Sequence, residues 1–90
     1  MKRAHTLDAA KTLVIHERAK TYGNAFEMHS QIALMWTAIL GHKIEAHQVA
    51  LLMAALKLAR AATNPEHEDN FIDLCGYAAL AGEMVNGDDE

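Results

Sequence analysis

This 90-residue chain is poor in the residues that several protein classes require. Its one cysteine cannot form an internal disulfide, and five glycines and one proline are too few for a linker or a collagen-like chain. No apolar run reaches the roughly 18 residues that a transmembrane helix needs, and no signal peptide is recognisable. We therefore expect neither a disulfide scaffold nor a membrane span, but a folded cytoplasmic protein.

The chain also lacks an excess of positive charge. Eight Lys and Arg stand against twelve Asp and Glu, which gives a formal net charge of -4. Because affinity for nucleic acids depends largely on neutralising phosphates, we do not expect a general nucleic-acid binder. Hydrophobic residues make up 51% of the chain, enough for one small core. The sequence predicts one domain, with its core over residues 6–85 and a polar tail over residues 86–90.

Apolar residues recur along the chain at the three- and four-residue intervals typical of α-helices. Gly23, Gly41 and the Asn64-Pro65 pair interrupt this pattern, because glycine closes helices and proline is tolerated only in their first turn. The fold class is therefore predicted to be all-α, with four antiparallel helices in a hairpin or bundle. The predicted helices span residues 7–20, 24–40, 45–62 and 65–85.

Two of these helices have candidate capping residues. Thr6 is placed to cap the first helix, and Asn24 followed by Glu27 is typical of a capping box at the start of the second. The second helix is expected to bury one apolar face. That face comprises Phe26, Ile32, Ala33, Trp36, Ile39 and Leu40.

The third predicted helix, residues 45–62, is apolar around most of its circumference. Such a helix needs more partners than one neighbour on each side. Four helices in 90 residues leave little room to supply them within one chain. We therefore expect a homo-oligomer, either a dimer or a tetramer.

Charged residues on the third and fourth predicted helices fall on sides that can face each other. Lys57 and Arg60 lie three residues apart, and Asp69, Asp73 and Tyr77 follow at steps of four. Counting outward from the turn places Arg60 opposite Asp69 and Lys57 opposite Asp73. The residues are open to two interpretations: ion pairs that fix the hairpin register, or a ligand site with cations for phosphate and a tyrosine that stacks on a base.

A second candidate cluster surrounds the first helix break. Arg18, Tyr22 and Asn24 lie near the exposed amides at the start of the second helix, where an anion is favoured. The alternative is an ordinary solvated helix end. Gly76, inside the fourth helix, indicates either close helix packing or room for a flat ligand beside Tyr77.

The histidines and the cysteine do not indicate a metal site. No two of the six histidines are four residues apart, and Cys75 has no histidine or cysteine close in sequence. His29 is expected to make an ordinary polar contact in the interior. We expect no bound metal and no cofactor.

Three segments carry a resemblance to a known family. Glu17-Arg18 with the residues up to Gly23, then residues 56–60, then residues 68–78 resemble a family of small, mostly phage-encoded helical proteins without an assigned function. The likeness covers residues 14–84. The arrangement is also similar to a shrunken MazG-type nucleotide pyrophosphohydrolase. That resemblance implies an all-α dimer or tetramer that binds nucleoside triphosphates through Mg²⁺.

The chain departs from the MazG pattern where the metal would be held. That family carries an E-x-x-E pair on one helix and an E-x-x-D pair on a later one. Here Asp73 can stand for the last acid, but position 70 is asparagine, and the preceding helix offers Lys57 and Arg60. Cations neutralise phosphate directly, so the resemblance implies nucleotide binding without hydrolysis, with Mg²⁺ needed only under the hydrolase alternative.

Phages also use small oligomeric helical proteins as sponges that sequester nucleotide signals of bacterial defence, including cyclic nucleotides. This chain is similar to them in size, composition and expected oligomerisation. We interpret it as such a sponge rather than an enzyme. The alternatives are a MazG-like hydrolase and a structural or protein-interaction module. The candidate ligand-binding residues are Lys57, Arg60, Asp69, Asp73, Tyr77, Arg18, Tyr22 and Asn24.

Overall fold

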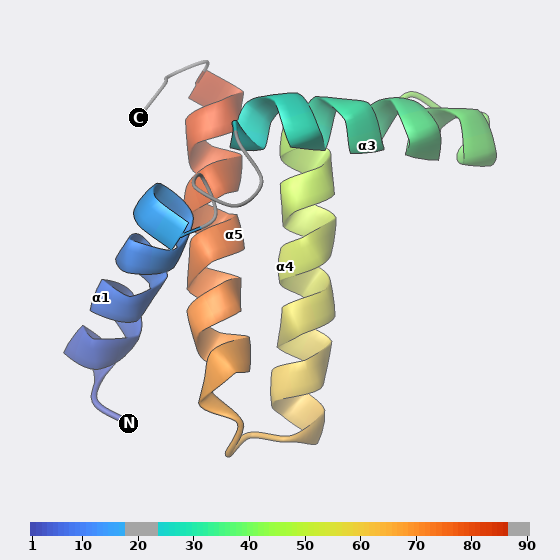
Figure 1. Cartoon of the computed structure of the whole chain (residues 1–90). Helices are drawn as coiled ribbons and strands as arrows, with labels where there is room; N and C mark the ends of the chain where they lie inside the picture. The colour runs from blue at the N-terminus through green and yellow to red at the C-terminus, as the bar shows by residue number, and fades with distance from the viewer. Residues whose placement is uncertain (18–23, 87–90) are drawn as a thin grey trace.

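The computed structural model describes residues 1–17 and 24–86, and these ranges contain helices and no strand (Figure 1). The all-α prediction is confirmed. Within this part of the chain, no helix is both long and apolar enough to cross a membrane. The elements are α1 (Arg3–Thr12), the π-helical turn η1 (Leu13–Glu17), α3 (Ala25–Leu40), α4 (Ala46–Thr63) and α5 (Glu68–Asn86).

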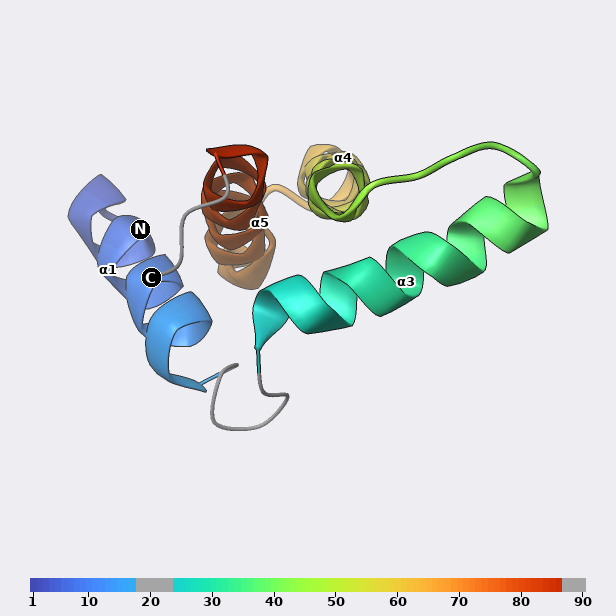
Figure 2. The same cartoon turned by 90° about the horizontal axis from the view of Figure 1, so that it is seen from above.

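The centre of the fold is an antiparallel hairpin of α4 and α5. α1 lies along the other side of α5, and α3 runs across one end of the hairpin instead of along it (Figures 1 and 2). Seen from above, α3 lies beside the hairpin, and its first half is the part next to α5 and α4 (Figure 2). Its second half continues past α4, on the side away from α5. The fold is therefore a hairpin with a crossing helix, rather than four parallel or antiparallel rods.

The first helix begins earlier than predicted. The backbone N–H of Thr6 donates to the carbonyl of Lys2 at 3.2 Å, so the helix already runs through Thr6. The N-cap position is Lys2, and the predicted Thr6 cap is wrong. After Thr12 the helix widens into η1, and the predicted end of the first helix at position 20 lies outside the described residues.

The boundaries of α3 are those that the sequence predicts. The Asn24 side chain accepts a hydrogen bond from the Glu27 backbone N–H at 3.0 Å, which satisfies one of the free amides of the first turn. Gly41 ends the helix with φ at 67°, a left-handed conformation that glycine adopts without strain. α4 then begins one residue after Glu45, whose backbone N–H donates to the Gln48 side chain at 2.8 Å.

The connection between α4 and α5 is longer than predicted. The Asn64 carbonyl accepts from the His67 N–H at 3.2 Å, which closes a turn with Pro65 at its second position. Proline favours that position of a β-turn because its φ is already correct, and asparagine favours the position before it. α5 therefore begins at Glu68 instead of Pro65.

The main core lies between α4 and α5 and is built largely of small side chains. Its buried members are Ala50, Ala54, Tyr77, Leu80, Ala81 and Met84. Val49 is the largest fully buried side chain in the described structure. A chain of this size buries a modest share of its surface, so each helix contact has a large effect on stability.

The predicted core face of α3 is buried only in part. Ala33 is 4% exposed, but Phe26 is 48%, Leu40 62% and Ile39 78% exposed. The periodicity of this face is correct. For Ile39 and Leu40 the prediction fails because the second half of α3 extends past α4, where Thr37 hydrogen-bonds to the backbone of Ile44 in the returning connection.

Gly76 lies where α5 packs closely against η1. A Cβ atom at this position would lie 2.8 Å from Val14 Cγ1, well inside contact distance. Close packing is therefore the reason for this glycine, as the first of the two sequence interpretations proposed. Valine is stiff at χ1, so its methyl group has little freedom to move aside.

We predict that Gly76→Ala lowers the free energy of unfolding by about 1–3 kcal/mol, because overpacking outweighs the gain in helix propensity. Val14→Ala in the same chain should restore part of the loss. Gly82→Ala is the matched control, because a Cβ atom there meets nothing within 4 Å, and it should be neutral or stabilising. Urea unfolding measures all four proteins, and an equal effect at both glycines would contradict this account.

Candidate functional site

The predicted ladder of charges between α4 and α5 is half formed. Lys57 Nζ lies 3.0 Å from Asp73 Oδ2, as the counting from the turn predicts. The two side chains are 14% and 18% exposed, so this ion pair is largely shielded from solvent. It joins the two helices near the middle of the hairpin. The predicted pairing of Lys57 with Asp73 is therefore present in the structure.

The other half of the ladder is absent from the described structure. Arg60 and Asp69 are both exposed, and no ion pair joins them within residues 24–86. The prediction of this pair is wrong because the turn at residues 64–67 delays the start of α5, which leaves Asp69 on an exposed first turn. The guanidinium of Arg60 is consequently available for another partner.

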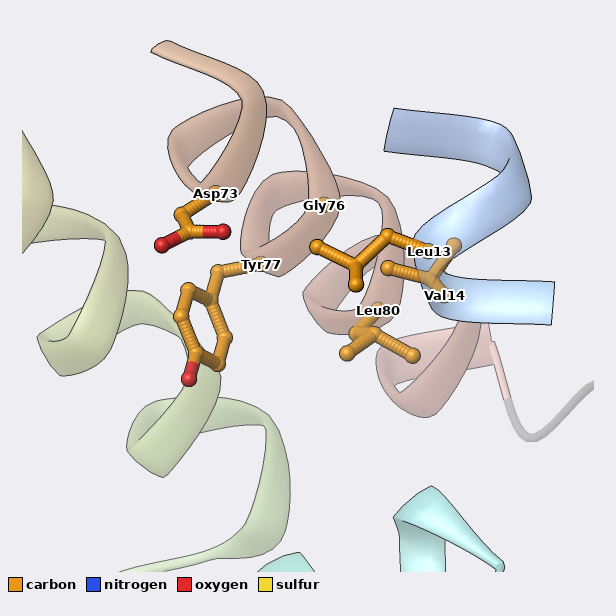
Figure 3. Close-up of a pocket in the computed structure, with 6 residues that line it drawn as sticks. All are labelled: Leu13, Val14, Asp73, Gly76, Tyr77 and Leu80. Atoms are coloured by element: carbon orange, nitrogen blue, oxygen red, sulfur yellow. The ribbon is translucent and has the colours of Figure 1, made fainter. Parts of the chain in front are cut away.

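Tyr77 is part of the core rather than the surface. It is 8% exposed, and its ring meets His29 edge-on, with centroids 6.3 Å apart and planes at 60°. Figure 3 shows Tyr77 and Asp73 on one side of Gly76, and Leu13 and Val14 of η1 on the other. The space among them is too narrow to admit a water molecule. A flat ligand therefore has no room beside Gly76 in this conformation.

His29 is the polar member of this interior. It is 5% exposed, and its Nδ1 lies 2.8 Å from the Ala25 carbonyl oxygen, within the same helix. The expectation of an ordinary interior contact is confirmed. This hydrogen bond and the tyrosine ring account for the burial of an imidazole.

A pocket of about 400 Å³ lies at the turn that joins α4 to α5. Its volume is within the range of small-molecule sites. Its walls are formed by the end of α4, the turn and the start of α5. The residues that line it are Ala59, Arg60, Thr63, Asn64, His67 and Asn70.

Asn70 is the most informative member of the pocket. It is only 5% exposed, yet no hydrogen bond holds its side chain within the described part of the chain. No buried side-chain polar atom is left both enclosed and unpaired in that part, so the amide of Asn70 reaches the pocket space. A nearly buried amide without a protein partner costs free energy unless a ligand or water satisfies it.

Three other side chains of the pocket can donate hydrogen bonds to a ligand. Arg60 presents a guanidinium, His67 an imidazole and Asn64 an amide, at the end where α5 begins. The acidic residues of that first turn, Glu68 and Asp69, do not line the pocket. A cation, an imidazole and a helix start suit an anion such as phosphate, and Asn70 adds a group that both donates and accepts.

The second candidate cluster is described only at its end. Arg18 and Tyr22 lie outside the described residues. The Asn24 side-chain oxygen is engaged in capping α3. In the described ranges, no group of three or more His, Cys, Asp or Glu is placed to hold a metal ion.

Sequence reasoning identified Arg60 but missed Thr63, Asn64, His67 and Asn70. These residues surround the only proline of the chain. The available signal was the spacing of His67 and Asn70, three residues apart and therefore on one side of the helix start. Asn70 attracted notice only as a departure from an acidic motif, because burial cannot be assigned to one polar residue from its spacing.

Comparison with known proteins identifies the family. A family model described as a domain of unknown function (DUF6378) matches residues 5–85. The chain is similar to the Gene 55 protein of Mycobacterium phage L5, with 36% identity over 85 residues, which cover 93% of this chain and 54% of that protein. It is also similar to the Gene 55 protein of Mycobacterium phage D29, with 39% identity over 72 residues, covering 80% and 48% respectively.

The chain thus spans about half the length of the curated relatives it matches. No solved structure matches it. The resemblance to a phage-encoded family without an assigned function is confirmed by these matches.

We predict that Lys57→Met lowers the free energy of unfolding by about 1.5–3 kcal/mol, because it removes the cation that lies 3.0 Å from the shielded carboxylate of Asp73. Lys43→Met removes the same charge from an exposed position between α3 and α4 and should change stability little. Urea unfolding of both variants at neutral pH tests the difference. Equal losses of stability in the two variants would show that the Lys57–Asp73 contact adds nothing beyond the general effect of removing one positive charge.

Proposed function

This chain belongs to the DUF6378 family, and we propose that it is a nucleotide-binding protein that sequesters a phosphorylated nucleotide signal without hydrolysing it. The observation that carries the proposal is the pocket at the α4–α5 turn. There an exposed Arg60 on α4 shares the pocket lining with Asn70 on α5, whose nearly buried side chain has no hydrogen bond within the described residues.

Arg60 is the proposed phosphate contact. Its guanidinium has no ion-pair partner among the described residues, and its planar fork matches two phosphate oxygens at once. His67 lies at the same end of the pocket and can donate a second hydrogen bond. This arrangement neutralises a phosphate without a metal ion.

Asn70 is the proposed contact to the rest of the nucleotide. A primary amide offers one acceptor and two donors, which is the pattern that pairs with the edge of a base such as adenine. Because the side chain is 5% exposed, its orientation is constrained by α4 and α5. A pocket of about 400 Å³ is large enough for one nucleotide unit.

Three of the residues predicted from the sequence act as supports in this proposal. The Lys57–Asp73 ion pair fixes the register of α4 against α5 and thereby holds Arg60 opposite Asn70. Tyr77 anchors the same helix in the core. Asp69 lies in the exposed first turn of α5, outside the pocket lining, and contacts from Asp69, Arg18 and Tyr22 remain part of the proposal.

Sequestration is preferred to hydrolysis because the pocket offers donors for phosphate instead of a set of metal ligands. The similarity to mycobacteriophage proteins agrees with a role inside the infected cell, where nucleotide signals act. In this proposal the protein is cytoplasmic, needs no cofactor and works as a homo-oligomer. A MazG-like, Mg²⁺-dependent hydrolase is the rival proposal for the same ligand class.

We predict that the purified protein, in the presence of a chelator, retains one member of a panel of linear and cyclic nucleotides. Bound material is released by heat and identified by mass spectrometry, and its affinity is measured by calorimetry. Arg60→Gln should weaken binding by at least about tenfold, because a charge-assisted contact is lost. Lys43→Gln, which removes a distant exposed cation, should bind like the unaltered protein.

Three other outcomes would each contradict a specific part of the proposal. Retention of no nucleotide by the folded protein would overturn it. Binding that Arg60→Gln leaves unchanged would remove the site from this pocket. Appearance of a cleaved product only after Mg²⁺ is added would favour the hydrolase.

A further inference from the structure

The solvent side of α4 is apolar along most of its length. Leu51 is 51% exposed and Leu58 59% exposed, and the neighbouring positions on that side are alanines. Leu51, Ala55, Leu58 and Ala62 recur at steps of four, three and four residues. That spacing averages about 3.5 residues and forms the contact seam of paired helices. No helix of the described structure covers this seam.

The overhanging half of α3 adds a second uncovered apolar surface beside the first. Leu40 lies seven residues after Ala33 and four after Trp36, so the three side chains share one helix face. Ala33 is 4% exposed, whereas Leu40 is 62% exposed, because α3 has passed α4 by that point. Figure 1 shows this half projecting from the top of α4, on the side away from α5. The overhanging half of α3 and the seam of α4 therefore border the same corner of the molecule, where α3 projects past the start of α4.

We propose that a second copy of this chain occupies that corner, so that α4 of each copy packs on the other and each overhanging α3 covers its partner. In a two-fold contact the same surface lies on both sides, so a self-contact is favoured where the surface carries no net charge. No Asp, Glu, Lys or Arg occurs between Glu27 and Lys43 or between Glu45 and Lys57. A charged partner would find nothing complementary on this surface.

The exposed area is sufficient for such a contact. Nine large apolar side chains of α3 and α4 are between 42% and 78% exposed, and together they present on the order of 500 Å² of apolar surface. A standard interface buries about 800 Å² on each partner, of which roughly 60% is apolar. The uncovered surface of α3 and α4 thus matches the apolar part of one standard interface.

The small side chains of the core also favour self-association, because a second copy would add buried apolar surface. Alanines supply half of the main α4–α5 core cluster. A second copy would bury leucines where the single chain buries alanines, and it would give α4 neighbours on both sides. The self-contact deepens the homo-oligomer of the proposed function, and it can be tested separately from nucleotide binding because the pocket and the seam involve different side chains of α4.

The test is the mass of the unaltered protein in solution, by light scattering and sedimentation from micromolar to near-millimolar concentration. We expect a species of twice the 9.9 kDa chain mass, or a multiple of it. Leu58→Arg should weaken self-association at least about tenfold, because it buries two unpaired charges at the two-fold contact. Ile39→Lys, on the overhang, should weaken it as well.

Leu7→Arg is the matched control. Leu7 is 60% exposed, almost the same as Leu58, but it lies on α1, away from the proposed surface. It should leave self-association unchanged, and circular dichroism confirms that each variant keeps its helical content. A monomer at every concentration would overturn the proposal. An effect of Leu7→Arg as large as that of Leu58→Arg would move the interface to another surface.

Discussion

The shielded ion pair between Lys57 and Asp73 is the contact that relates the two central helices of this fold. Two antiparallel helices with alanine-rich faces can slide along each other at little cost, because small side chains interlock weakly. A charged pair at 3.0 Å, with both side chains mostly covered, favours the register in which these two groups meet. That register places Arg60 of α4 across the turn from Asn70 of α5.

Local chemistry explains which parts of the fold were predictable. The ends of α3 depend on Asn24 and Gly41 alone, and both act as the sequence predicts. The start of α5 depends on whether Pro65 enters a helix or a turn, and the choice is made by the His67 hydrogen bond to Asn64. Periodicity found the apolar face of α3, but it contains no information about where the neighbouring helix stops.

The residues of the candidate site also differ in how far the sequence alone could predict them. Lys57 and Asp73 could be paired from the sequence because both lie in regular helix, where counting from the turn is reliable. Arg60 and Asp69 could not, because an error of three residues in the helix start changes which side chains face each other. The contribution of Asn70 depends on burial and on a missing hydrogen bond, and both are properties of the packed hairpin.

The proposed nucleotide pocket and the proposed self-contact use different residues of α4. Arg60, Ala59 and Thr63 line the pocket, while Leu58 and Ala62 belong to the solvent-side seam. Because these positions alternate along the last two turns of α4, the pocket would open at the edge of a two-fold contact. A partner copy there would shield the pocket from water and strengthen the attraction between Arg60 and an anion. A short chain with a thin core could thus obtain both stability and an enclosed site from the same association.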